Sequence, residues 1–105
     1  MFDYAEAERV IEMAKRKIDP SLMIVIGSVA NGTAGEDSDL DLIIVKESDE
    51  NSFISGARAR LALKDSSIPI DIIIYTPKEF ERDLSNKYSL ASEAVATGKI
   101  VHGSI

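Results

Sequence analysis

Three aspartates and one Gly–Ser pair are the residues of this sequence whose types and spacing could do chemistry. Asp39 and Asp41 lie two residues apart around the start of the apolar run Leu40–Val45, and Asp71 interrupts a later run of isoleucines. Because successive side chains of a strand point to opposite faces, Asp39 and Asp41 project from one face, roughly 6–7 Å apart. If the two runs form neighbouring strands, Asp71 can join the other two aspartates in one acidic cluster.

Crowded carboxylates need a compensating positive charge. An unpaired carboxylate buried among isoleucines costs several kcal/mol, or its pKa shifts until the group is neutral. A divalent cation removes this repulsion, and a few hard oxygen ligands that leave positions for water and phosphate suit Mg²⁺. The sequence therefore predicts a magnesium site formed by Asp39, Asp41 and Asp71.

The Gly–Ser pair, Gly27 and Ser28, follows the apolar run Leu22–Ile26. Glycine permits a close approach of the backbone, and the Ser28 hydroxyl with N–H groups at a helix start can hold phosphate oxygens. Metal-binding carboxylates that face a phosphate-binding turn are the parts needed for nucleotidyl transfer. One metal lowers the pKa of an attacking hydroxyl, and the other stabilises the leaving pyrophosphate.

Short apolar runs and helical periodicity predict the elements that must position these groups. Three continuous runs rich in β-branched residues are typical of strands covered on both faces: Leu22–Ile26, Leu40–Val45 and Ile68–Tyr75. The spacing of Ala7, Val10, Ile11, Ala14 and Ile18 predicts a first helix over Asp3–Ile18. A second helix is predicted over Asn51–Lys64, because Phe53, Ala57 and Leu61 repeat every fourth residue there.

Two further helices and an edge strand are predicted near the end of the sequence. Thr76-Pro77-Lys78-Glu79 combines a capping residue, a proline at the first helical position and a capping-box glutamate. A last helix over Ser89–Thr97 is expected to bury Leu90, Ala91, Ala94 and Val95 and to end at Gly98 as its C′ residue. Lys99–His102 could add a short edge strand, with His102 at the surface. The fold class is α/β (α+β): one domain over residues 1–105, with helices packed on a small mixed sheet of three to four strands.

Composition excludes several classes of protein. The chain has 105 residues, a net charge of −6 and a pI near 4.7, which argues against stable DNA binding because phosphate backbones are gripped by excess Lys and Arg. It contains no cysteine, so thiol catalysis and zinc–thiolate sites are excluded. Its apolar runs are too short to span a membrane. We expect a soluble, cytoplasmic protein.

Structural explanations exist for some of these residues. Asp37-Ser38-Asp39 could by itself be turn chemistry. An EF-hand starting at Asp37 fails because Leu42 replaces the required glycine, and a P-loop fails because Thr33 stands where lysine is needed. Arg58 and Arg60 could contact a partner or nucleotide, but we expect them at solvated helix positions. The three phenylalanines are expected to be core residues: Phe2, Phe53 and Phe80.

The spacing of these motifs resembles a known family. Gly27-Ser28, ten further residues, Asp39-Leu40-Asp41 and a later strand aspartate at Asp71 resemble the signature of the DNA polymerase β-type nucleotidyltransferase superfamily. The short length and the segment Thr76–Glu81 resemble its minimal nucleotidyltransferase (MNT) branch. The resemblance implies a polymerase β-like fold, two Mg²⁺ ions and ATP as substrate.

The resemblance also implies roles for the five residues. Asp39 and Asp41 would bind both metals, Asp71 would complete the catalytic metal site and help activate the acceptor hydroxyl, and Gly27 and Ser28 would contact the nucleotide phosphates. Many members of the family carry a basic residue in place of Asn31, which would strengthen phosphate binding.

Similar minimal domains act as antitoxins paired with a HEPN-family toxin. The implied reaction is in-line attack of a partner tyrosine hydroxyl on the α-phosphate of ATP, which transfers AMP and releases pyrophosphate. A binding module of the same fold that neutralises a toxin by direct contact, with transfer weak or lost, is the alternative. Modification of a small molecule is a lesser possibility, because it would normally need an added domain.

Overall fold

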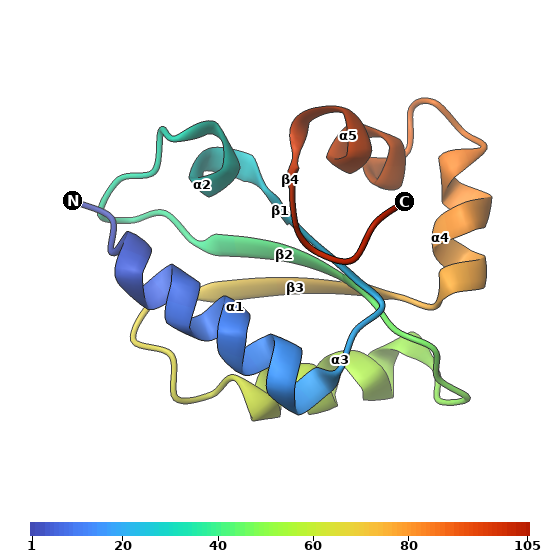
Figure 1. The fold of residues 1–105 in the computed structure, drawn as a ribbon, viewed down its shortest axis with the longest axis horizontal. Coiled ribbons are helices and arrows are strands. Elements are labelled where there is room, and N and C mark those ends of the chain that lie inside the picture. The colour runs from blue at the N-terminus through green and yellow to red at the C-terminus, as the bar shows by residue number, and fades with distance from the viewer.

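A four-stranded mixed sheet with helices on both faces forms the protein, and the computed structural model describes residues 1–105. The elements in chain order are α1 (Tyr4–Ile18), β1 (Leu22–Ile26), α2 (Gly27–Asn31), β2 (Leu40–Val45), α3 (Ser52–Ala62), β3 (Ile70–Tyr75), α4 (Pro77–Leu84), α5 (Leu90–Thr97) and β4 (Lys99–His102). The strand order is β3-β2-β1-β4 (Figure 1). β2 and β3 are parallel, whereas β1 is antiparallel to both of its neighbours. The predicted fold class is confirmed.

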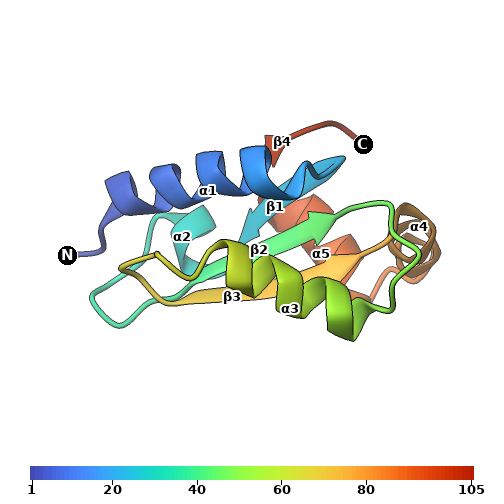
Figure 2. The same cartoon turned by 90° about the horizontal axis from the view of Figure 1, so that it is seen from below.

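The helices divide between the two faces of the sheet, and each face has its own apolar core. α1 and α3 cover one face, seen from their side in Figure 2, and pack on alternate strand residues that include Leu40, Leu42 and Ile44. α4 and α5 cover part of the other face, where Phe80 packs with Ile43 and their neighbours. Alternate residues of β2 therefore pack against different helices: one set against α1 and α3, and the other against α4 and α5. No helix is both long and apolar enough to cross a membrane.

Side-chain caps explain where four of the helices begin. Asp3, Asn51 and Ser89 each accept a hydrogen bond from the backbone N–H three residues later, at the starts of α1, α3 and α5. The predicted capping box of α4 is confirmed: Thr76 Oγ1 accepts from the Glu79 N–H, and the Glu79 carboxylate accepts from the Thr76 N–H at 2.8 Å. These contacts satisfy N–H groups that have no partner within a helix.

The buried face predicted for α3 is wrong. Phe53 and Leu61 are 83% and 66% exposed, so Phe53 is not a core residue, whereas Phe2 and Phe80 are. Small residues form the buried face instead: Ser55, Gly56 and Ala59. Small side chains allow the helix to lie close to the sheet, where a Cβ at Gly56 would already be 3.7 Å from Ile74 Cγ2. The apolar periodicity identified a real face of the helix, but that face points outward.

Predictions for the chain end and for β3 are partly wrong as well. In α5 only Ala91 and Ala94 are buried, whereas Leu90 and Val95 are exposed. Gly98 caps α5 in an extended conformation, so the left-handed C′ conformation is absent. A glycine is needed there because a Cβ would lie 2.6 Å from the Ala94 carbonyl oxygen.

β3 begins at Ile70, two residues later than predicted, and only Ile72 is fully buried because the strand lies at the edge of the sheet. β1 and β2 are the interior strands and are almost completely buried, as predicted. β4 forms the opposite edge, as expected, and holds the half-buried His102.

Candidate active site

The aspartates from two strands meet where the parallel strands β2 and β3 begin. Asp41 and Asp71 are direct partners in the register of the two strands, and Asp39 precedes β2 by one residue. Their positions in the alternation place them on the sheet face that α4 and α5 partly cover, away from α1 and α3. The condition for an acidic cluster, that β2 and β3 are neighbouring strands, is therefore met, and Asp41 and Asp71 lie side by side in the sheet.

The three carboxylates have no protein partners. None of them accepts a hydrogen bond, and none takes part in the ion pairs of the structure, which use other acids. Burial raises the pKa of Asp41, and the negative charges of Asp71 and Asp39 raise that pKa further. The carboxylates thus repel one another while they are ionised, so a cation between them would be stabilised.

The Gly27 turn lies against Asp41. Gly27 opens α2 with a φ of +73°, a conformation that side chains disfavour, and a Cβ built on it would be 2.6 Å from Asp41 Oδ2. This contact follows from the strand register, because Ile26, the last residue of β1, pairs with Asp41 on β2. The next residue, Ser28, is half-buried and its hydroxyl forms no hydrogen bond. Of the five predicted site residues, Gly27 and Ser28 therefore begin α2, and the three aspartates lie at the starts of β2 and β3.

Magnesium fits these residues by the chemistry of its ligands, although the ligand set is not assembled in advance. No three His, Cys, Asp or Glu side chains are arranged to hold a metal ion. The side chains of Asp39 and Asp71 are exposed, so they can rotate towards Asp41 without disturbing the core. Carboxylate oxygens without hydrogen-bond donors are the ligands that Mg²⁺ prefers. The metal site at Asp39, Asp41 and Asp71 stays a prediction.

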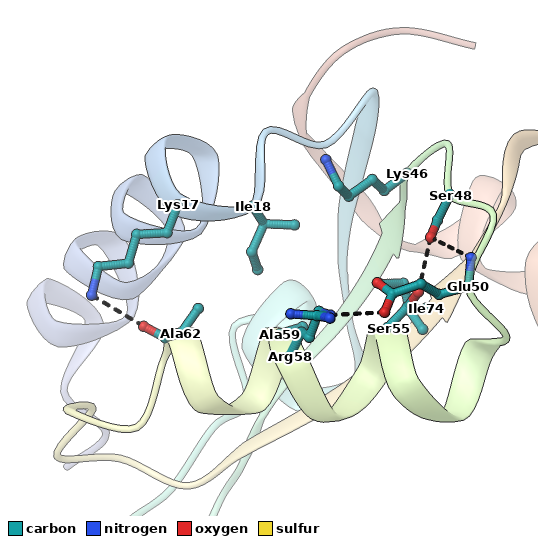
Figure 3. A pocket seen from close by; sticks show the side chains of 10 residues that line it. All are labelled: Lys17, Ile18, Lys46, Ser48, Glu50, Ser55, Arg58, Ala59, Ala62 and Ile74. Carbon is teal, nitrogen blue, oxygen red and sulfur yellow. Dashed lines mark hydrogen bonds and ion pairs between the residues drawn. The ribbon is translucent and has the colours of Figure 1, made fainter.

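The sequence did not indicate a cavity of about 190 Å³ away from these residues. It lies between the C-terminal end of α1, α3 and the residues that follow β2 (Figure 3). Arg58 lines it and pairs with Glu50 at 2.9 Å. Arg60 is exposed, as expected, but donates a hydrogen bond to the Ile72 carbonyl oxygen at 3.3 Å. No sequence pattern indicates this cavity, because the segments that line it come together only in the folded chain.

Comparisons with known proteins agree with this geometry. The nucleotidyltransferase domain family matches residues 7–97. A solved chain described as a minimal nucleotidyltransferase is 31% identical, with 90% of this chain and 88% of that chain covered and a TM-score of 0.58.

Two further solved structures share the fold at lower identity. One is described as a nucleotidyltransferase from Sulfolobus solfataricus, at 19% identity, coverage of 75% and 78%, and a TM-score of 0.51. The other is a toxin–antitoxin crystallised with AMP-PNP, at 18% identity, coverage of 92% and 73%, and a TM-score of 0.56. A comparison with curated proteins gives no significant match. The family match over most of the chain and the 31% identity to a minimal nucleotidyltransferase lead to one conclusion: this chain belongs to the nucleotidyltransferase domain family and is a nucleotidyltransferase.

Proposed function

We propose that this nucleotidyltransferase transfers AMP from ATP to a tyrosine hydroxyl of a partner protein, and that the partner is a HEPN-family toxin for which this chain is the antitoxin. The observation that carries the enzymatic part is the pairing of Asp41 with Asp71 on parallel strands, beside a glycine turn that touches Asp41. Carboxylates and a phosphate-binding turn within one site are the parts that nucleotidyl transfer requires.

In this proposal the chain's residues position the reactants and hold charge. Asp39 and Asp41 would hold two Mg²⁺ ions, and Asp71 would complete the site nearer the acceptor and receive the proton of its hydroxyl. Gly27 and Ser28 would hold the phosphates through backbone N–H groups and the free Ser28 hydroxyl. The bound ions would supply Lewis-acid stabilisation of the charge that develops on the phosphates. The acceptor oxygen attacks the α-phosphorus in line, the bond from that phosphorus to the bridging oxygen breaks, and pyrophosphate leaves.

The choice of ATP and of a toxin partner has separate support. A solved structure of the same fold is a toxin–antitoxin with AMP-PNP, a non-hydrolysable relative of ATP. At 18% identity that likeness supports the fold alone, and the toxin partner is proposed by analogy with that complex.

Transfer of label from ATP tests the proposal. The chain is incubated with Mg²⁺, ATP labelled at the α-phosphate and the protein encoded next to it, which the proposal takes to be a HEPN-family toxin. The proteins are then separated by electrophoresis. We expect label on the partner, and loss of label with Asp41→Asn or Asp71→Asn. Asp37→Asn is the matched control, because Asp37 is an exposed aspartate of the same segment that is outside the cluster. Label that survives Asp41→Asn, or that depends equally on Asp37, would contradict the proposed site.

The binding-module alternative rests on Asn31. This exposed residue ends α2, where related sequences often carry a basic side chain that could neutralise phosphate charge. If neutralisation by contact is the function, toxin activity should be suppressed equally by the parent chain and by Asp41→Asn, without label on the toxin. If transfer is the function, Asp41→Asn should lose both label and protection, and Asn31→Arg should increase the rate of labelling.

A further inference from the structure

The strand β3 lies at the edge of the sheet, so one of its two sides has no neighbouring strand (Figure 1). Within a strand, the N–H and carbonyl of one residue point to the same side, and successive residues alternate between the two sides. The carbonyl oxygens of Pro69 and Tyr75 accept hydrogen bonds from the N–H groups of Leu40 and Lys46, at 2.9 Å each. The odd-numbered residues of β3 therefore face β2, and the even-numbered ones face the free edge.

The free edge presents the N–H and carbonyl groups of Ile70, Ile72 and Ile74. Only one of these groups has a partner: the Ile72 carbonyl oxygen accepts a hydrogen bond from Arg60 Nη2 at 3.3 Å. The others take part in no hydrogen bond with a side chain, a turn or a loop. A row of unpaired backbone groups is a template to which another strand can add.

The sequence of β3 makes this template a hazard. The strand reads IDIIIY, with four isoleucines, one tyrosine and a single charge, and it contains neither proline nor glycine. Segments of about six residues with high β-propensity and little charge associate through their edges when these are exposed. The residues that form a good strand here would therefore also favour its pairing with a copy of itself.

The helix α3, which packs beside β3, holds Arg60 against this edge (Figure 2). The guanidinium has no acidic partner, because the ion pairs of the structure use other cations. One turn earlier in the helix, a Cβ at Gly56 would lie 3.0 Å from Arg60 Nη1. Glycine inside a helix lowers its stability, and at Gly56 it leaves space for the guanidinium beside the strand.

The backbone of this chain does not fill the space beside the edge. A cavity of about 230 Å³ lies there, and its lining includes Arg60 from α3 and Ile70 and Ile72 from β3. Just before the strand, the Ser66 hydroxyl donates to the Ile68 carbonyl oxygen at 2.7 Å and accepts from the Ile68 N–H at 3.1 Å. Along β3 itself, Arg60 is the one side chain that occupies a backbone group of the edge.

The strand alone offers little resistance to pairing with a second copy. In an antiparallel arrangement centred on Ile72, Ile70 of one copy would face Ile74 of the other. Asp71, the single charge of the strand, would face Ile73, so no like charges would lie directly opposite each other. Resistance must therefore come from a group outside the strand.

We propose that Arg60 keeps the free edge of β3 closed to the same edge of a second copy of this chain. Pairing would break the hydrogen bond from Arg60 to the Ile72 carbonyl oxygen, which lies at the centre of that arrangement. It would also bring two guanidinium groups together at this centre, and like charges that face each other at an interface are unfavourable. An isoleucine-rich strand can thus lie at the edge of the sheet without association. The inference is independent of nucleotidyl transfer.

The substitution Arg60→Met tests the proposal, because it keeps an apolar stem and removes the charge and the hydrogen-bond donors. Light scattering gives the weight-average mass of parent and variant over a range of concentrations. We expect Arg60→Met to reach at least twice the mass of the parent at equal concentration, reversibly on dilution. Arg58→Met is the matched control and should keep the mass of the parent, because it removes the same charge from the same helix at a side chain that pairs with Glu50. Arg60→Lys, which keeps a cation at the edge, should also stay monodisperse at the mass of the parent.

A second substitution shows whether the association uses the strand edge. Ile70 is the first residue of β3 and its N–H faces the free edge, so proline is tolerated there and removes only an outward donor. Ile70→Pro added to Arg60→Met should return the mass to that of the parent. Every variant should keep a cooperative thermal transition, which shows that folded chains associate.

Four outcomes would overturn the proposal. Arg60→Met could keep the mass of the parent up to its highest soluble concentration. Arg58→Met or Arg60→Lys could associate as strongly as Arg60→Met, which would show that the hydrogen-bonded cation at the edge is not the cause. Association that survives Ile70→Pro would place the contact elsewhere on the molecule. Association that accompanies loss of the cooperative transition would assign it to unfolded chains.

Discussion

Two glycine substitutions can separate a requirement of the backbone from a requirement of the site. Gly27 and Gly32 begin and cap the short helix α2, and their φ angles are +73° and +74°. A Cβ at Gly27 would lie 2.6 Å from Asp41 Oδ2, whereas a Cβ at Gly32 would meet nothing within 4 Å. Gly27→Ala and Gly32→Ala therefore both place a side chain at a positive φ, and only the first displaces the Asp41 carboxylate.

The expected magnitudes follow from that geometry. A left-handed conformation costs an L-residue roughly 1–2 kcal/mol. At about 2.1 cal/mol/K per residue, unfolding 105 residues has an entropy near ~220 cal/mol/K, so each variant should lose about 5–9 °C in Tm. The carboxylate of Asp41 ends a flexible side chain and can rotate away, so the two losses should be similar. Mg-ATP at about 100 times its Kd stabilises the folded state by about 2.7 kcal/mol, or roughly 12 °C on the same scale.

Thermal melts of the parent and both variants, with and without Mg-ATP, provide the measurement. We expect Gly32→Ala to keep the ligand-induced rise in Tm and Gly27→Ala to lose most of it. If Mg-ATP raises the Tm of both variants equally, the reasoning is refuted. Binding of Mg-ATP would then not depend on the position of the Asp41 carboxylate beside Gly27. If the two variants without ligand differ in Tm by more than about 5 °C, which corresponds to about 1 kcal/mol, the carboxylate of Asp41 cannot rotate freely.

Three further predictions concern single groups. Hydrogen bonds from Arg9 and Ser67 lower the pKa of Glu6 from 4.5 to about 2, so its stabilising effect is complete above about pH 4.5 and is lost as the pH falls towards about 2. The difference in Tm between the parent and Glu6→Gln should therefore be largest at neutral pH and should close at about pH 2. The pKa of Asp41 is raised, so its ionised form weakens the folded state above that pKa, and Asp41→Asn should increase the Tm measured at neutral pH without ligand. Thr76→Ala removes the capping box of α4 and should cost ~1 kcal/mol in urea unfolding, with no effect on binding of Mg-ATP.

The sequence was sufficient for a small mixed sheet and for the bounds of its two interior strands. β1 and β2 have the predicted bounds because their continuous apolar runs suit interior strands. The helix between β2 and β3 suits their parallel direction, but the pairing of Asp41 with Asp71 depends on a register that only the folded sheet provides. The contact between Asp41 and Gly27 was not predictable either, because it depends on the antiparallel register of β1 on β2.

The orientation of α3 also could not be predicted. Periodicity shows that Phe53 and Leu61 share a helix face, but it does not show whether that face packs on the sheet or is exposed. Competition between this face and the small residues Ser55 and Ala59 is decided by how closely the helix can approach β3, which is a property of the assembled fold. The same limit applies to Gly98. A side chain there would clash with Ile24 on β1 and with the Ala94 carbonyl oxygen in α5, and the sequence does not show that these groups lie so close.

The register of β2 on β3 has an evolutionary consequence. Because Asp41 and Asp71 occupy the same rung of a parallel ladder, their separation is set by the spacing of hydrogen-bonded strands, about 4.8 Å. The residues that connect the two strands, which include α3, do not change this pairing when their composition changes. Selection could thus change the sequence of α3 and its flanking loops while the spacing of the two carboxylates is inherited intact.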